Sequence, residues 1–123
     1  MRVIAGEFRS RRLKTIPGLA TRPTPDRLRE TLFNILGSQV MDAVFLDAYA
    51  GTGAVGIEAL SRGARQVIFI ERSKNAAEVI RENLAALGIE SRALLVTTSV
   101  ASSLARYKAD IVFLDPPYER EAE

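Results

Sequence analysis

With 123 residues, of which 47% are hydrophobic and 26% charged, and a net charge of +2, the chain has the composition of one globular domain. It contains no histidine and no cysteine, which excludes a Ser-His-Asp hydrolase, a disulfide framework and a metal site with imidazole or thiolate ligands. No apolar run approaches the ~20 residues of a membrane span and the N-terminus lacks a signal-peptide core, so we expect a cytoplasmic protein without membrane contact.

The positive charge is concentrated in the N-terminal part of the chain. Residues 1–29 hold eight arginine or lysine residues and two acidic ones, a net charge of +6, so the remainder carries −4. Weak alternation around Gly6 predicts a short β-hairpin with strands over residues 2–5 and 12–15. A basic arm on an acidic body indicates a polyanionic partner such as nucleic acid, although a solvated arginine-rich surface would show the same charge pattern.

A proline-rich loop over residues 16–25 is followed by a helix. The helix is expected to begin at Pro25, with Thr24 as its N-cap, and to end at Gly37. Helical spacing puts four apolar residues on its predicted inner face, namely Leu28, Leu32, Ile35 and Leu36. We therefore divide the chain into a basic arm and loop, residues 1–24, and a main domain, residues 25–123.

From residue 43 onward, predicted strands and helices alternate. The four strands cover residues 43–47, 66–71, 92–97 and 110–114. The three helices between them cover residues 54–62, 74–87 and 100–107. This alternation predicts an α/β fold with a parallel sheet and right-handed crossovers, and the apolar strands are typical of a sheet covered on both faces. In such a fold, ligands bind beyond the carboxyl ends of the strands.

The first two predicted strands end in residues that suit an adenosine-containing cofactor. The run from Gly51 to Gly56 fits the G-x-G-x-x-G pattern, in which glycines let the backbone approach a ligand closely. Glu71 follows 20 residues after Gly51 and can accept both hydroxyl hydrogens of a ribose. Asp47 would repel a pyrophosphate and attract an ammonium group, which favours S-adenosylmethionine over NAD. A tight turn that binds no ligand would also explain the glycines.

The fourth predicted strand runs directly into Asp115-Pro116-Pro117-Tyr118. This turn resembles the Asp/Asn-Pro-Pro-aromatic motif of methyltransferases that act on the amino groups of nucleobases and glutamine side chains. The Asp115 side chain and the Pro116 carbonyl can each accept an N–H of an exocyclic amine and turn its lone pair toward a methyl donor. Pro117 stiffens the turn, and Tyr118 offers a face on which an extruded base can stack. A stiff proline turn with a surface aromatic is the structural alternative.

With these motifs in place, the whole chain resembles the RsmD-type 16S ribosomal RNA guanine-N2 methyltransferases of bacteria. The similarity rests on residues 2–6, 21–36, 46–64 and 115–118. It implies a Rossmann-like class I methyltransferase fold, of which strands one to four are present and three C-terminal strands are missing. It further implies S-adenosylmethionine as cofactor and methylation of the exocyclic N2 of guanine 966 in the small subunit's 16S rRNA, on an assembly intermediate of that subunit.

The resemblance also assigns roles to individual residues, with no metal among them. The catalytic residues would be Asp115, Pro116, Pro117 and Tyr118. The cofactor would contact Asp47, Ala48, Gly51, Gly53, Glu71, Arg72, Ser99 and Val100. The RNA would contact Arg2, Arg9, Arg11, Arg12, Arg22 and Thr24. Arg27 and Asn34 would join Arg22 and Thr24 at the pocket mouth, although Arg27 can also pair with Glu30 at helical spacing.

Other interpretations remain open at this point. The chain can be a non-catalytic N-terminal fragment that binds RNA or a partner, an NAD-linked oxidoreductase, or a DNA amino-methyltransferase. Related methyltransferases carry an acidic residue after the third strand, whereas this chain has Thr98-Ser99-Val100, so the adenine would be held by backbone groups and apolar contact. The fourth strand forms an open sheet edge, which predicts a homodimer.

Overall fold

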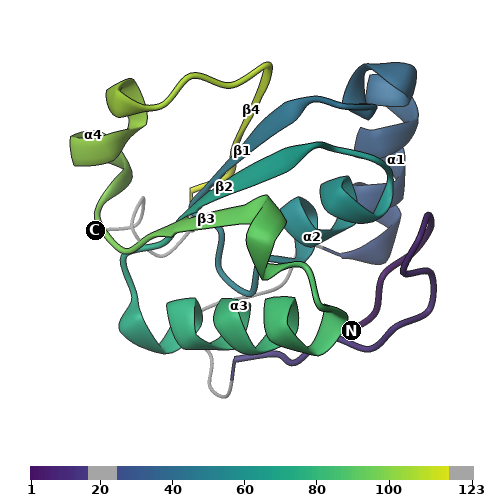
Figure 1. Ribbon diagram of the computed structural model, residues 1–123, viewed down its shortest axis with the longest axis horizontal. Coiled ribbons are helices and arrows are strands. Elements are labelled where there is room, and N and C mark those ends of the chain that lie inside the picture. The colour runs from purple at the N-terminus through teal and green to yellow at the C-terminus, as the bar shows by residue number, and fades with distance from the viewer. Residues whose placement is uncertain (17–24, 117–123) are drawn as a thin grey trace.

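The structure is a computed structural model that describes residues 1–16 and 25–116. Its centre is a parallel sheet of four strands in the order β3-β2-β1-β4 (Figure 1). The strands are β1 (Val44–Ala48), β2 (Gln66–Ile70), β3 (Ala93–Val96) and β4 (Ile111–Leu114). The predicted α/β fold with a parallel sheet is therefore confirmed, and each strand lies within one or two residues of its predicted bounds.

The helices also follow the predicted order. They are α1 (Asp26–Leu36), α2 (Ala54–Ser61), α3 (Lys74–Leu87) and α4 (Val100–Ser103), with short 3-10 turns at η1 (Gly37–Val40), η2 (Glu90–Arg92) and η3 (Leu104–Arg106). Helix α3 has the predicted bounds because Ser73 caps its first turn and Gly88, at φ +70°, ends it. None of the helices in residues 1–16 and 25–116 is long and apolar enough to cross a membrane.

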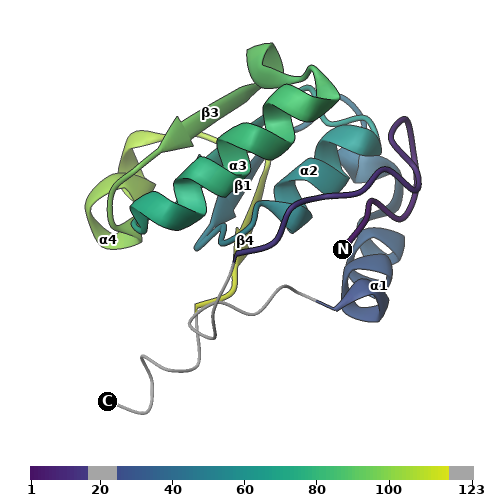
Figure 2. The same cartoon turned by 90° about the horizontal axis from the view of Figure 1, so that it is seen from below.

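The two faces of the sheet are covered unequally. Alternate side chains of the strands, such as Phe45 and Phe69, point into the larger core, together with residues of the arm, α1, α2 and α3. The other face carries Leu46 and Ile70 and packs in a smaller cluster with Val100 of α4. Figure 2 shows α2, α3 and the arm on the same side of the sheet. The arm, residues 1–24, is thus part of the main core wherever the structure describes it, and the division at residue 24 stays a prediction.

The predicted β-hairpin of the arm is confirmed in part, as a short antiparallel pairing with an isolated bridge between Arg2 and Arg12 and no regular strands. The Val3 N–H donates to the Arg11 carbonyl at 2.9 Å across this pairing. The backbone N–H groups of Ile4 and Ala5 donate instead to the Glu58 carboxylate of α2 at 3.0 and 3.1 Å. Gly6 has φ +88°, and a Cβ there would lie 2.0 Å from the backbone oxygen of Ser61. The arm is therefore held by its own second segment over residues 1–3 and by α2 over residues 4–7.

The predicted inner face of α1 is also wrong in part. Leu28 and Ile35 are 57% and 75% exposed, whereas Arg29 and Phe33 are buried. The helix turns this way because Arg29 reaches the buried Glu58 and Phe33 stacks on Phe45. Helix α1 begins at Asp26, one residue after the predicted start, and the predicted N-cap Thr24 lies outside the described residues.

The expectation of a sheet covered on both faces holds for β1 and β2 and fails for β4. Every residue of β1 and β2 after the first is buried. Val112 and Leu114 of β4 are 48% and 54% exposed. Strand β4 pairs with β1 on one side and has no second strand beside it in the part of the chain that the structure describes. The open edge predicted from the sequence is thus present.

Candidate cofactor and catalytic site

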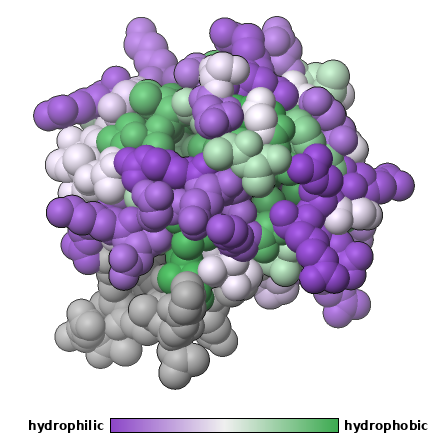
Figure 3. All heavy atoms as spheres, turned by 60° about the horizontal axis from the view of Figure 1, so that its bottom comes forward, coloured by the Kyte–Doolittle hydropathy of each residue, from purple (hydrophilic) through white to green (hydrophobic). Residues whose placement is uncertain are grey.

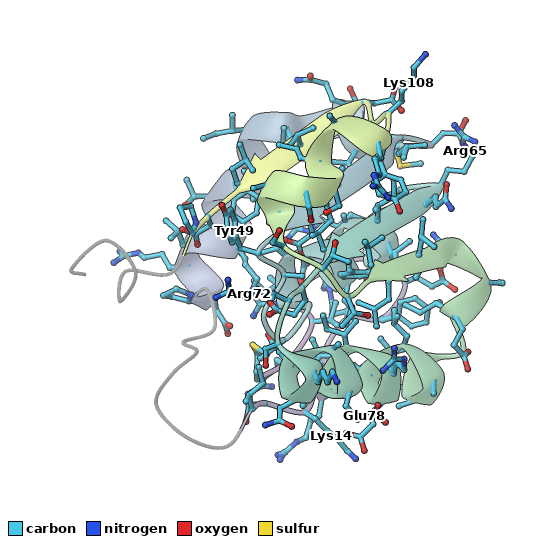
Figure 4. All side chains as sticks on the ribbon, turned by 90° about the vertical axis from the view of Figure 1, so that its left-hand side faces the viewer. Lys14, Tyr49, Arg65, Arg72, Glu78 and Lys108 are labelled. Carbon is cyan, nitrogen blue, oxygen red and sulfur yellow. The ribbon has the colours of Figure 1, made fainter. Side chains whose placement is uncertain are left out.

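Three carboxylates lie at the carboxyl edge of the sheet. Asp47 belongs to β1, Glu71 directly follows β2, and Asp115 directly follows β4. The register pairs the last residue of β1, Ala48, with Ile70 on one side and Leu114 on the other. The parallel arrangement therefore brings side chains from three separate segments together, as the sequence predicted. Figure 4 labels Tyr49 and Arg72, the residues of the loops after β1 and β2 at this edge.

Asp47 is a buried carboxyl group, 2% exposed. Its Oδ2 accepts the backbone N–H of Gly56, in the first turn of α2, at 3.0 Å. Burial raises the pKa of Asp47 well above its ordinary value; the charges of Glu71 and Asp115 raise it further, and the Gly56 N–H opposes the shift. A positive group beside Asp47 would reverse this effect, so the position suits a cationic ligand.

The loop between β1 and α2 is left-handed at three positions. Tyr49, Gly51 and Gly53 have φ values of +57°, +59° and +82°. The N–H of Gly53 donates to the Ala50 carbonyl at 2.8 Å, which closes the turn before α2. A Cβ on Gly53 would lie 3.1 Å from Ile80 of α3. Glycine is thus required here for close packing as well as for the backbone conformation, and Tyr49 adopts a conformation that side chains rarely take.

Glu71 joins this loop to the one that follows β2. Its Oε1 accepts the N–H of Gly51 at 2.8 Å, and its Oε2 accepts the N–H of Ser73 at 2.8 Å. A carboxylate oxygen has a second lone pair, so both oxygens can still accept a hydroxyl hydrogen. The two backbone contacts fix the carboxylate of the half-buried Glu71 at the edge of the sheet. The neighbouring Arg72 is exposed.

The predicted adenine contacts, Ser99 and Val100, begin α4. The Ser99 hydroxyl caps this helix by accepting the N–H of Ser102 at 3.3 Å. Val100 is 9% exposed and packs in the smaller core with Ala48, itself fully buried. Their side chains serve the fold, so a ligand here would meet backbone groups and apolar atoms.

Of the predicted catalytic turn, the structure describes Asp115 and Pro116, which are both exposed. Pro117 and Tyr118 lie outside the described residues. Asp115 lies near enough to Asp47 for its charge to raise the pKa of Asp47. The donor set at this edge fits S-adenosylmethionine: a buried carboxylate for an ammonium group, a held carboxylate for a ribose, and a glycine turn that allows close approach.

The predicted RNA-contacting arginines of the arm are not all equivalent. All four described arginines are exposed, but Arg11 also donates from Nη2 to the Ala86 carbonyl of α3 at 3.1 Å, which Arg2, Arg9 and Arg12 do not. Figure 3 views the molecule from the arm side and shows hydrophilic side chains over much of that face, with apolar atoms visible between them. Arg22 and Thr24 lie outside the described residues.

The arm and the first turn of α1 border a cleft of about 280 Å³, whose lining includes Arg2, Asp26, Arg27 and Glu30. Arg27 and Asn34, both predicted for the pocket mouth, are exposed. The ion pair in the first turn of α1 joins Arg29 to Asp26 rather than Arg27 to Glu30 in the described chain. Arg27 therefore remains accessible to a ligand.

Sequence reasoning missed two buried polar groups behind the site. Glu58, fully buried in α2, bonds to Ile4, Ala5, Arg29 and Arg62. Asn83, 2% exposed in α3, is the second. A single charged residue within the apolar helix over 54–61 was the available signal for Glu58. No local pattern distinguishes Asn83 from an ordinary polar residue of an amphipathic helix.

Residues 1–123 match the family described as Conserved hypothetical protein 95. The ribosomal RNA small subunit methyltransferase D of Escherichia coli is 42% identical over 122 residues, which cover 98% of this chain and 61% of that protein. The protein of the same name from Haemophilus influenzae is 40% identical over 123 residues, covering 96% of this chain and 64% of that protein. The chain thus spans less than two thirds of the length of these two relatives.

A solved structure agrees with the sequence comparison. The Escherichia coli protein YhhF has a TM-score of 0.86 and 41% identity, and the match covers 98% of this chain and 65% of that one. These matches confirm the predicted class I methyltransferase fold, a class whose cofactor is S-adenosylmethionine rather than a dinucleotide. On the strength of the full-length family match and these relatives, the chain belongs to the RsmD-type family of ribosomal RNA methyltransferases.

Proposed function

We propose that this chain binds S-adenosylmethionine at the carboxyl edge of its sheet and methylates the exocyclic N2 of guanine 966 in 16S rRNA, within an assembling small subunit in the cytoplasm. The observation that carries the proposal is the convergence of Asp47, Glu71 and Asp115 beside the left-handed loop at Gly51 and Gly53. Three carboxylates around one edge favour a cationic ligand, and carboxylates at strand ends suit the ammonium group and the ribose hydroxyls of a nucleoside with an amino-acid tail.

The geometry of the loops after β1 and β2 supports the following cofactor contacts. Asp47 holds the ammonium group, which removes the charge conflict with Glu71 and Asp115. Glu71, fixed by the N–H groups of Gly51 and Ser73, accepts the ribose hydroxyls. The cofactor also contacts Ala48, Gly53 and Arg72, which lie in or beside the loops after β1 and β2. The adenine contacts the backbone at Ser99 and Val100. When bound, the cofactor supplies a methyl group on a positively charged sulfur.

The catalytic step needs positioning rather than a strong base. The Asp115 carboxylate and the Pro116 carbonyl each accept one N–H of the guanine amine, which turns its lone pair toward the methyl carbon. A nitrogen–carbon bond forms as the carbon–sulfur bond breaks, and the nitrogen then loses one proton to the Asp115 carboxylate or to water. Pro117 keeps the turn stiff, and Tyr118 stacks on the extruded base. The absence of histidine from the chain is consistent with this chemistry.

The exposed arginines of the arm supply the phosphate contacts. Arg2, Arg9 and Arg12 face solvent, and we include Arg22, Thr24 and the partly engaged Arg11 in the same contact surface. Phosphate contacts release counterions, so RNA affinity should fall steeply with salt. Such contacts fix the orientation of the RNA and contribute little to the choice of base.

The deciding experiment is transfer of a labelled methyl group to 16S rRNA by this 123-residue chain, with duplex DNA as a parallel substrate. We expect label in the guanine of the RNA and none in the DNA. Asp115→Ala should lower transfer at least 100-fold and leave the affinity for S-adenosylhomocysteine within about twofold, because Asp115 acts on the amine. Equal loss of both would make Asp115 a structural residue.

The second candidate is a module that binds cofactor and RNA without turnover. This module is favoured by the exposed apolar residues Val112 and Leu114 on the edge strand β4, because an unpaired apolar edge tends to pair with a further strand. We propose that a second copy of the chain supplies it. Binding of S-adenosylhomocysteine and RNA without transfer would support this module. A single-copy mass in light scattering would contradict the dimer.

A further inference from the structure

Asn83 of α3 is a buried amide with no part in the proposed chemistry. It is 2% exposed, and its helical neighbours Ile80, Leu84 and Leu87 belong to the core. A buried amide is costly unless its hydrogen bonds are satisfied. This one makes three bonds, all to residues far away in the chain, which indicates that it holds specific segments together.

The contacts of Asn83 join the arm to the cofactor loop. Its Oδ1 accepts the backbone N–H of Lys14 at 2.7 Å, and its Nδ2 donates to the Lys14 carbonyl at 3.2 Å. The same Nδ2 donates to the carbonyl of Thr52 at 3.4 Å. Thr52, 3% exposed, lies between Gly51 and Gly53 at the centre of the left-handed loop. Figure 4 shows Lys14 beside α3.

A second contact ties the arm to the helix that follows the same loop. Ile4 and Ala5 donate their backbone N–H groups to Glu58 of α2. Helix α2 starts at Ala54, directly after Gly53, and its Gly56 N–H donates to Asp47. The arm is therefore attached at two points, within the loop through Asn83 and after the loop through Glu58 of α2.

We propose that Asn83 is a positioning residue that couples the arm to the cofactor loop, so that RNA bound to the arm and cofactor bound at the loop change each other's affinity. The coupling to RNA and cofactor rests on the proposed function. The link between arm and loop rests on the hydrogen bonds alone. Because coupling between two sites is reciprocal, RNA should change cofactor affinity by the same factor as cofactor changes RNA affinity.

The link is tested first without any ligand, by amide hydrogen exchange. Asn83→Asp keeps the acceptor for the Lys14 N–H and loses the donor to the carbonyls of Thr52 and Lys14. Lys14→Pro removes the backbone N–H that the arm donates to Asn83, at an exposed position. It therefore tests the same link even if Asn83→Asp does not fold. Both should speed exchange at the amides of Gly51, Gly53 and Gly56 by fivefold or more while the amides of β2 keep their protection. Unchanged exchange at the loop in both variants would overturn the proposal.

Matched controls separate positioning from general destabilisation. Lys14→Ala and Glu82→Gln each remove the exposed Lys14–Glu82 ion pair and keep the backbone contact, so loop exchange should stay at the wild-type rate. Leu84→Ala destabilises the same helix through the core and should speed exchange throughout the domain. A selective effect on the loop in Leu84→Ala would show that Asn83 has no special role.

The coupling itself is measured with S-adenosylhomocysteine and a 16S rRNA fragment around nucleotide 966. In the wild-type chain, the RNA should change the calorimetric Kd of S-adenosylhomocysteine about fivefold or more, and Asn83→Asp should bring that factor to about one. If the wild-type chain bound no S-adenosylhomocysteine, the proposed function would be contradicted. The hydrogen-exchange experiment would still test the link between arm and loop. If RNA changed the Kd of S-adenosylhomocysteine by the same factor in Asn83→Asp as in the wild-type chain, the proposed coupling through Asn83 would be contradicted.

Discussion

Two carboxylates are buried in the part of the chain that the structure describes, Glu58 in α2 and Asp47 near the end of β1, and their surroundings are opposite in charge. Glu58 accepts two backbone N–H groups from the arm and forms ion pairs with Arg29 and Arg62. Asp47 accepts one backbone N–H and faces the charges of two other carboxylates. Both belong to one continuous segment, in which the glycine loop joins β1 to α2.

The difference distinguishes Glu58, whose charge is compensated by arginines of the protein, from Asp47, whose charge is available to a cationic ligand. Buried charge is costly, and a fold that neutralises it with its own cations gains a rigid, specific contact. A buried carboxylate surrounded by like charges has no such partner in the protein, and perturbed groups of that kind gather at functional sites. Glu58 therefore indicates how the arm is held, and Asp47 indicates what the site binds.

The largest expected effect is on stability and concerns Glu58. Glu58→Gln removes the charge at nearly constant volume and leaves the fully buried Arg29 without its buried counter-ion. Breaking a buried pair in this way should lower the free energy of unfolding by about 3–5 kcal/mol, measured by urea denaturation. Glu78→Gln, which breaks the exposed pair with Arg81 in α3, is the control and should cost less than about 0.5 kcal/mol. Equal effects would remove the distinction between the two kinds of carboxylate.

Asp47→Asn should produce two effects of opposite sign. An asparagine oxygen can still accept the Gly56 N–H, and the variant no longer buries a charge beside Glu71 and Asp115. We expect the free energy of unfolding to rise at pH 7, since the folded wild-type chain holds a buried carboxylate beside two like charges. The affinity for S-adenosylhomocysteine should fall at least tenfold, because the ammonium group loses its counter-charge. A loss of both stability and affinity would mean that Asp47 supports the fold as Glu58 does.

The same carboxyl group predicts how stability depends on pH. Burial raises the pKa of Asp47 in the folded chain above its unfolded value of about 3.9, so the folded state holds the proton more tightly. The contribution to stability is present below pH ~3.9 and is lost as the pH rises through the folded pKa. In urea denaturation from pH 4 to 8, the stability advantage of Asp47→Asn over the wild-type chain should therefore grow with pH. An advantage that stays constant across this range would contradict the raised pKa.

The sequence was sufficient for the features that depend on local patterns. Ser73 and Gly88 bound α3 as their cap chemistry predicts, and the parallel sheet brings Asp47, Glu71 and Asp115 to one edge as the strand order requires. Each of these features follows from a residue's own neighbours or from the rule that ligands bind at the ends of parallel strands.

The features that the sequence did not predict depend on contacts between distant segments. The predicted hairpin of the arm is shorter than expected because Ile4 and Ala5 donate to Glu58, which is more than 50 residues away. The inner face of α1 was misjudged for a related reason, since Arg29, a residue type usually found on the surface, is buried by its pair with Glu58. One buried glutamate thus accounts for both differences, because periodicity carries no information about the partners of a charged side chain.

The smallest expected effect tests how the Glu58 charge is shared among its partners. Arg62 donates from Nε to Glu58 at 2.8 Å, and its guanidinium lies 5.1 Å from the centre of the Phe33 ring. Arg62→Met should lower the free energy of unfolding by about 1–2 kcal/mol, less than Glu58→Gln, because Arg29 and the two arm N–H groups still compensate the carboxylate. Arg62→Lys keeps the charge without the planar stacking on Phe33 and should recover about half of that loss. If Arg62→Met were as damaging as Glu58→Gln in the same urea titration, Arg62 would be the principal counter-ion, and the arm contacts of Glu58 would depend on it rather than on Arg29.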